Sequence, residues 1–161
     1  MAKDDKTNVM RLLSAAGISF DEHKYDPVTT DGELVAKALG TDPSATFKTL
    51  VTVAESKKNY VFVIPVNQEL DLKACARAVG EKSISMLPQK NLLPLTGYVH
   101  GGCSPIGMKK SFQTTLDSSC LNYSKITFSA GKLGRQVSVS PQDLIDYIKA
   151  GTAPLTRPKC H

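Results

Sequence analysis

The chain has no tryptophan, and its 161 residues include only five tyrosines and five phenylalanines. An aromatic platform on which single-stranded bases could stack is therefore poorly supported. No apolar run approaches the roughly 18 residues that a membrane span needs, and residues 1–6 lack the apolar core of a secretory signal. We expect a cytoplasmic protein that does not enter the membrane.

Paired cysteines and clustered metal ligands are also missing. The four cysteines form no C-x-x-C pair, which favours reduced thiols over disulfides; they are Cys75, Cys103, Cys120 and Cys160. The three histidines show no metal-ligand spacing. The sequence therefore predicts no structural zinc, no catalysis through a bound transition metal and no cofactor.

Acidic residues are too few to balance the basic ones. Twenty Lys and Arg stand against 15 Asp and Glu, which leaves a net charge of +5. Such an excess fits a polyanionic partner such as RNA, although many small proteins carry one for solubility alone. Two lysine pairs are candidates for contact with an RNA backbone, the alternative being a solvated face: Lys57, Lys58, Lys109 and Lys110.

Helices are expected near both ends of the chain and strands in the middle. Apolar periodicity and capping residues predict helices over 4–16, 32–38 and 71–79, a broken one over 87–95, and a last one from 141. Runs of Val, Ile, Phe and Thr predict strands over 18–25, 47–54, 60–66, 98–100, 114–116, 126–128 and 136–139, with a turn at 129–134. This pattern fits one α+β domain over 1–161 around a curled mixed sheet, with a loose tail at 152–161.

A loop at 97–107 contains four glycines and Pro105. Glycine adopts backbone conformations closed to other residues and lets a ligand approach the main chain, while proline fixes one φ angle. We expect a stiff backbone wall for a small polar group. Cys103 or Ser104 could act there as a nucleophile with His100 as its base, but on an extended strand His100 would point to the opposite side, which favours a structural thiol.

Lys48 stands at the start of an otherwise apolar strand, in the segment Phe47–Val51. Strand alternation places Lys48 on the face opposite Phe47 and Val51. Its ammonium could lie in a cleft with its stem along apolar surface, where it could hold a phosphate or a developing oxyanion. The alternative is an edge-strand lysine that discourages aggregation.

Four motifs in this order resemble the YbaK-type Cys-tRNA(Pro) deacylases, which are related to the editing domain of bacterial prolyl-tRNA synthetases. They are F-K-T-L at 47–50, T-G-Y-V-H-G-G-C-S-P-I-G-M-K-K at 96–110, S-A-G-K-L-G at 129–134 and S-P-Q-D-L at 140–144. The resemblance implies a six- or seven-stranded mixed β-barrel flanked by helices. It also implies a free-standing enzyme that works beside prolyl-tRNA synthetase and clears tRNA(Pro) mischarged with cysteine.

The resemblance further implies which residues form the site. The catalytic set would be Lys48, Gly101, Gly102 and Ser129, with backbone N–H groups of the two glycines orienting the ester carbonyl. For substrate binding the resemblance implies Tyr25, Asp31 and Thr49, although some members have an aromatic residue in place of Asp31. We also expect Cys103 and Ser104 of the glycine loop to bind the substrate. The implied chemistry is substrate-assisted, because the thiol of the misplaced cysteine attacks its own ester and leaves as a cyclic thiolactone.

Three other hypotheses remain open from the sequence. The enzyme could clear alanine from tRNA(Pro) instead of cysteine. It could be a non-catalytic module that binds tRNA or a synthetase. It could also be an ordinary cysteine hydrolase that uses Cys103.

Overall fold

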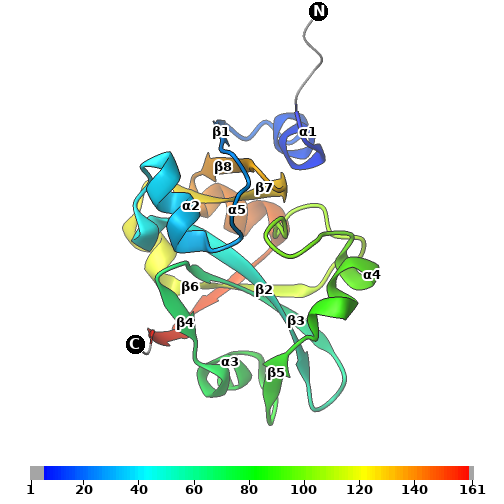
Figure 1. Ribbon diagram of the computed structural model, residues 1–161. Coiled ribbons are helices and arrows are strands. Elements are labelled where there is room, and N and C mark those ends of the chain that lie inside the picture. The colour runs from blue at the N-terminus through cyan, green and yellow to red at the C-terminus, as the bar shows by residue number, and fades with distance from the viewer. Residues whose placement is uncertain (1–5, 160–161) are drawn as a thin grey trace, which may run out of the picture.

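The computed structural model of the protein describes residues 6–159, which form helices and strands in mixed order (Figure 1). The α-helices are α1 (Asn8–Ala15), α2 (Gly32–Leu39), α3 (Leu72–Val79), α4 (Leu92–Thr96) and α5 (Pro141–Ile148). The strands are β1 (Phe20–Lys24), β2 (Phe47–Ala54), β3 (Asn59–Pro65), β4 (Gln68–Leu70), β5 (Ile84–Met86), β6 (Gln113–Asp117), β7 (Ile126–Lys132), β8 (Arg135–Val139), β9 (Gly151–Ala153) and β10 (Thr156–Pro158).

The strands of the described residues form three sheets. The largest has the order β5-β2-β3-β6-β9, and the others have the orders β1-β8-β7 and β10-β4. β2 runs antiparallel to β3, whereas β3 and β6 run parallel, so the largest sheet is mixed. One isolated bridge, Thr46 to Thr127, connects it to the three-stranded sheet. The α+β class is confirmed. The closed barrel is not, because β5 and β9 remain edges of the largest sheet.

The central strand β3 is buried on both faces because hydrophobic clusters cover both sides of the sheet. Val61 and Val63 belong to the cluster that also contains α1, α5 and the three-stranded sheet. Phe62 and Ile64 point the other way, into a cluster with α3 and β5. In Figure 1 α1 and the three-stranded sheet lie at one end of the molecule, and α3 with β5 lies at the other. The start of β2 lies where the largest sheet meets the three-stranded sheet.

Capping residues fix the helix beginnings as the sequence predicts. Asp31 precedes α2, and its carboxylate accepts a hydrogen bond of 2.9 Å from the Glu33 N–H. Ser140 precedes α5 and Asp71 precedes α3, each with a side chain that accepts from the first turn. These predicted helices are confirmed within a few residues at their ends.

Three predictions about the second half of the chain are wrong. Residues 98–100 form no strand but lead into a turn. β7 continues through Ser129 to Lys132, so the turn is shorter than 129–134. The tail is not loose up to residue 159, because β9 and β10 pair with β6 and β4 and Leu155 between them is fully buried. A buried leucine offsets the ordering entropy of the short segment that carries it. Cys160 and His161 lie outside the described residues.

Candidate active site

A cavity of about 280 Å³ opens between β2, the glycine loop and the β7–β8 hairpin. Six of the predicted site residues line it: Tyr25, Lys48, Thr49, Gly101, Cys103 and Ser129. These residues come from four separate segments of the sequence, and the fold brings them to one place. Gly102, Ser104 and Asp31 are not among the lining residues.

Lys48 reaches the cavity from β2, where it pairs with Ile64 of β3. Its side chain is half-buried. Burial lowers the pKa of the Lys48 ammonium, and the positive charge of Lys159 lowers it further, while the carboxylates of Asp31, Glu33 and Glu69 act in the opposite direction. The Lys48 ammonium in the cavity is therefore partly shielded from water, which strengthens its attraction to an anionic group.

Asp31 serves a structural purpose at the edge of this site. Its carboxylate caps α2 through the N–H groups of Glu33 and Leu34, at 2.9 and 3.4 Å. It still acts on the Lys48 ammonium electrostatically. Asp31 is not among the residues that line the cavity, and what the structure shows of it is the position and charge of the helix start. Its predicted part in substrate binding stays a prediction.

The two adjacent glycines of the loop differ, because Gly101 lines the cavity and Gly102 is bonded within the loop. Gly101 has φ +87°, and a Cβ there would lie 2.7 Å from Thr30 Cγ2 and 2.8 Å from Leu133 Cδ2. Only glycine fits this position without displacing its neighbours. Gly102 is buried and its N–H donates to the Val99 carbonyl at 3.0 Å. The Gly102 N–H is thus occupied and does not orient an ester carbonyl, contrary to the prediction.

Ser104 also supports the loop from within. It is fully buried, and its hydroxyl accepts a hydrogen bond of 3.3 Å from the Ile106 N–H. A side chain in that position cannot touch a substrate in the cavity. The prediction that Ser104 binds substrate is therefore wrong.

Cys103 lines the cavity but is a poor nucleophile. It is 8% exposed, and burial raises the pKa of its thiol to about 12. The reactive form of cysteine is the thiolate, so a thiol with this pKa is almost entirely unreactive near neutral pH. His100 lies on the turn beside the cavity, and not on a strand that points away as expected. Although His100 is near, the protonated state of the Cys103 thiol argues against a cysteine hydrolase.

Two buried oxygen atoms of the site have no hydrogen-bond partner among the described residues. One is Oγ1 of Thr49 and the other is Oε1 of Gln136, a cavity residue whose side chain is 7% exposed. Ser129 pairs with Gln136 across β7 and β8, and its own hydroxyl accepts from the Gly131 N–H at 3.1 Å. A buried acceptor without a partner is unfavourable, so these atoms are suited to donors on a ligand.

Gln136 and Thr30 are cavity residues that the sequence did not indicate. The sequence contained a hint of Gln136, because a turn at 133–134 places Ser129 and Gln136 on facing strands. Pairing these two residues also requires knowledge of the bulge between Ser129 and Lys132, which shifts the strand register. A one-residue error in register would have placed Gln136 on the opposite face.

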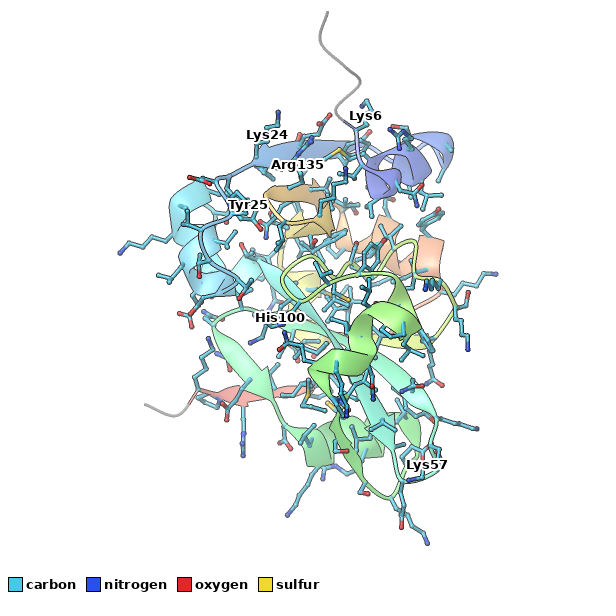
Figure 2. The ribbon with its side chains drawn as sticks, turned by 45° about the vertical axis from the view of Figure 1, so that its right-hand side comes forward. Lys6, Lys24, Tyr25, Lys57, His100 and Arg135 are labelled. Atoms are coloured by element: carbon cyan, nitrogen blue, oxygen red, sulfur yellow. The ribbon has the colours of Figure 1, made fainter. Side chains whose placement is uncertain are left out.

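The predicted RNA-binding lysines lie outside the cavity. Figure 2 shows Lys57 at the far end of the molecule from Tyr25, at the turn between β2 and β3. Lys58 follows it in the same exposed turn. Lys109 and Lys110 are exposed after the glycine loop, where Lys109 Nζ donates to the Pro94 carbonyl at 3.5 Å. The structure thus separates Lys57 and Lys58 from the site.

Two kinds of feature are absent from residues 6–159. No helix in this range is long and apolar enough to cross a membrane. No group of three or more His, Cys, Asp or Glu in this range has the geometry to hold a metal ion.

Known proteins resemble this chain over most of its length. The family model described as "Aminoacyl-tRNA editing domain" matches residues 26–147. A protein of Enterococcus faecalis (strain ATCC 700802 / V583), named "Putative Cys-tRNA(Pro)/Cys-tRNA(Cys) deacylase EbsC", is 42% identical over 153 residues, which cover 94% of this chain and 93% of that protein.

Solved structures share the fold at lower identity. One, described as "hypothetical protein APE2540", has a TM-score of 0.86 at 22% identity and covers 94% of this chain and 100% of its own. Another, "a putative trans-editing enzyme for prolyl tRNA synthetase", has a TM-score of 0.77 at 24% identity and covers 92% of this chain and 96% of its own. The family match and the 42% identical relative lead to one conclusion: this chain belongs to the aminoacyl-tRNA editing domain family.

Proposed function

We propose that the protein is a trans-editing enzyme that removes cysteine from mischarged Cys-tRNA(Pro) by breaking the aminoacyl ester. The observation that carries this proposal is the half-buried Lys48 inside a cavity of about 280 Å³. That volume suits an amino acid and the ribose to which it is esterified. The name of the 42% identical relative supports cysteine as the amino acid.

Lys48 would bind the negative charge of the substrate. Its ammonium can hold the oxygen atoms of the terminal ribose or phosphate, or the oxyanion that develops when the ester carbonyl is attacked. Such a contact is stronger than one in open solvent because the Lys48 side chain is half-buried. Proximity and orientation of this kind can lower a barrier by up to about 7–11 kcal/mol in ideal cases.

The buried acceptors would bind the amino group. The α-ammonium of an aminoacyl ester carries three N–H donors, and Gln136 Oε1 and Thr49 Oγ1 are buried oxygen atoms of cavity residues without a hydrogen-bond partner among the described residues. A hydrogen bond from a charged donor contributes about 1.5–3 kcal/mol. This contact would fix the side chain of the substrate relative to its own carbonyl.

The substrate thiol would then act as the nucleophile. Its sulfur forms a bond to the ester carbonyl carbon, the bond from that carbon to the ribose oxygen breaks, and the ribose oxygen takes the proton that the thiol lost. The products are a tRNA with a free terminal hydroxyl and a cyclic thiolactone, which water later opens to cysteine. Alanine and proline have no such nucleophile, so the same cavity would spare them. Cys103 would contribute packing only.

The cellular setting follows from the substrate. Mischarged tRNA(Pro) arises where prolyl-tRNA synthetase works, so we place this enzyme beside that synthetase in the cytoplasm. The enzyme would need no metal and no cofactor, because the substrate supplies the nucleophile.

The test compares tRNA(Pro) charged with cysteine, alanine or proline, with EDTA present throughout. We expect the purified chain to release cysteine at least tenfold faster than alanine or proline, the ratio that about 1.4 kcal/mol of selectivity supplies. Trapping of the thiolactone would establish the route. Faster release of alanine would favour the alanine-clearing alternative, and binding without release of any amino acid would favour the accessory module.

A further inference from the structure

The substrate thiol has to lose a proton before its sulfur can attack the ester, because the thiolate is the reactive form of cysteine. Near neutral pH only a few per cent of a free cysteine is thiolate. The ribose oxygen that leaves has to gain a proton. A base on the cavity wall that accepts the first proton and returns it to the ribose oxygen would assist both events.

Four ionisable side chains line the cavity within residues 6–159, and no Asp or Glu is among them. They are Tyr25, Lys48, His100 and Cys103. Tyrosine and lysine in ordinary surroundings keep their protons near neutral pH, and burial raises the pKa of the Cys103 thiol to about 12. Histidine ordinarily changes charge between pH 5 and 8, and its neutral ring has a nitrogen that accepts a proton. His100 is therefore the cavity residue best suited to take the thiol proton.

The backbone turn at 99–102 fixes the place of His100. The Gly102 N–H donates to the Val99 carbonyl at 3.0 Å, which closes a turn with His100 and Gly101 as its two central residues. Gly101 has φ +87°, the positive value that the second central residue of a type II turn needs. Side chains from the segment before α2 and from the β7–β8 hairpin would lie within 2.8 Å of a Cβ on Gly101. The turn that carries His100 is thus packed closely on two sides.

The His100 ring is available to a ligand. The residue is exposed, and its side chain has no hydrogen bond or ion pair with any other residue in the part of the chain that the structure describes. His23 differs, because its Nε2 lies 2.8 Å from Ser138 Oγ and it does not line the cavity. Figure 2 shows His100 between the level of Tyr25 and that of Lys57. One histidine is thus free at the cavity, and the other is bonded outside it.

We propose that the His100 imidazole accepts the proton of the substrate thiol and delivers it to the ribose oxygen. The proposal rests on the proposed function, because the proton belongs to a cysteine that is esterified to the RNA. The proton passes to the neutral ring as the sulfur bonds to the carbonyl carbon. The imidazolium then returns it to the ribose oxygen as the bond from that carbon to the oxygen breaks. No proton is gained or lost overall, and the Lys48 ammonium keeps its own proton and holds the oxyanion.

Ionisable groups from each segment packed against the turn bear on the charge of the His100 ring. Three of them line the cavity with His100, one lies on the β7–β8 hairpin and one precedes α2. In chain order they are Tyr25, Asp31, Lys48, Cys103 and Lys132. Substitution of His100 alone leaves all five in place, so a change on the acid side of the pH profile is assigned to His100 itself.

The experiment measures cysteine release from Cys-tRNA(Pro) by the purified protein from about pH 5 to about pH 9, a range that covers the charge change of histidine. Activity of the unchanged protein should rise with pH on the acid side. His100→Ala and His100→Gln should each release cysteine about tenfold more slowly at pH 7, where little of the thiol ionises unaided. The ratio of rates should shrink toward pH 9, because the thiol then ionises by itself.

Added imidazole provides the readout that a structural role would not move. It should enter the space left in His100→Ala and restore much of the rate, and it should not help His100→Gln, whose side chain fills that space. His23→Ala is the matched control, which should keep the full rate and show no response to imidazole. Rates measured without protein are subtracted, because imidazole itself cleaves esters.

The outcomes separate this proposal from the proposed function. Full activity of His100→Ala at pH 7, or a loss that is equal at every pH and unaffected by imidazole, would overturn the role of His100 and leave deacylation intact. An acid-side rise that persists in His100→Gln and disappears in Lys48→Arg would assign the proton transfer to Lys48 instead. Absence of cysteine release by the unchanged protein would overturn the proposed function, and the proton transfer with it.

Discussion

The two ends of the β2–β3 hairpin each carry lysine in very different surroundings. Lys48, near the start of β2, is half-buried and lines the cavity, whereas Lys57 is exposed at the turn with φ 75°. Lys48 lies on β2 and Lys57 lies in the turn that joins β2 to β3, so both belong to the same hairpin. What differs is that the glycine loop and the β7–β8 hairpin cover only the Lys48 end. The segments that pack over a lysine therefore decide whether its ammonium is partly buried and faces a cavity.

The energetic consequences of the two environments also differ. Removing an ammonium from water is unfavourable, and the lowered pKa of Lys48 is the sign of that. An exposed lysine at a turn interacts weakly with its surroundings because water and salt screen it. The lysine at one end of the hairpin thus lowers the stability of the fold, and the lysine at the other end does not. Ionisable groups with a shifted pKa are common in functional sites. The predictions below test this contrast.

The largest effect should come from Lys48→Ala. We expect kcat/KM for Cys-tRNA(Pro) to fall about 10²–10³-fold, as for other losses of a charge-stabilising group. The free energy of unfolding should not decrease, because a half-buried charge is removed. Rates of cysteine release and a thermal melt measure the two quantities. Lys57→Ala should leave both unchanged, and equal losses in the two variants would contradict the contrast.

The second largest effect on activity should come from Gln136→Leu. It removes the Oε1 acceptor that we assign to the substrate amino group, so kcat/KM should fall about tenfold or more, in line with about 1.5–3 kcal/mol. Because that acceptor has no partner in the free protein among the described residues, thermal stability should hold or rise. A fall in both activity and melting temperature would indicate a structural role instead.

The third largest effect should appear on the alkaline side of the profile of activity against pH. If the Lys48 ammonium binds the substrate, activity declines as pH rises through its pKa, which lies below the usual range for lysine. Lys159→Ala removes a repelling charge, so the pKa of Lys48 should rise and the decline should move to higher pH. Lys159→Arg keeps the charge and should keep the profile. Uncatalysed ester hydrolysis, measured with Lys48→Ala, has to be subtracted, and an unmoved profile in Lys159→Ala would argue against this role of Lys48.

The same lowered pKa affects folding. The folded protein releases the Lys48 proton at a lower pH than the unfolded chain, so between the two pKa values the unfolded chain binds more protons. The free energy of unfolding should therefore rise with pH across that window.

The smallest effect should come from Cys103→Ala. We expect most of the activity to remain, because the thiol with a pKa of about 12 is not the nucleophile. A loss of about 1 kcal/mol in stability is expected from the small cavity left behind. Alkylation with iodoacetamide should inactivate the protein slowly or not at all. Complete loss of cysteine release in Cys103→Ala would restore the hydrolase hypothesis.

Local sequence was a reliable guide wherever a rule depends on neighbours in the chain. Asp31, Asp71 and Ser140 cap the helices that follow them because a cap involves residues only two or three positions away. The strands β2 and β3 were evident from their Val, Ile and Phe content. The same local rules failed at 152–159, because Leu155 is buried by segments far away in the sequence.

The candidate site was predictable only through its motifs. The motifs indicated Lys48, Gly101 and Ser129, and all three line one cavity. They also indicated Gly102 and Ser104, whose polar groups turn out to be bonded within the loop. Gln136 escaped notice because its orientation depends on the bulge in β7.

The amino-acid sequence by itself determined the helix caps, the β2–β3 hairpin and the editing-family motifs. These features are set by short-range sterics and hydrogen bonding, which a stretch of a few residues contains. Tertiary structure alone decided which lysine is partly buried, that the Gly102 N–H is bonded within its own loop and which residues line the cavity. Burial and strand register depend on segments that are distant along the chain, and no local pattern specifies them.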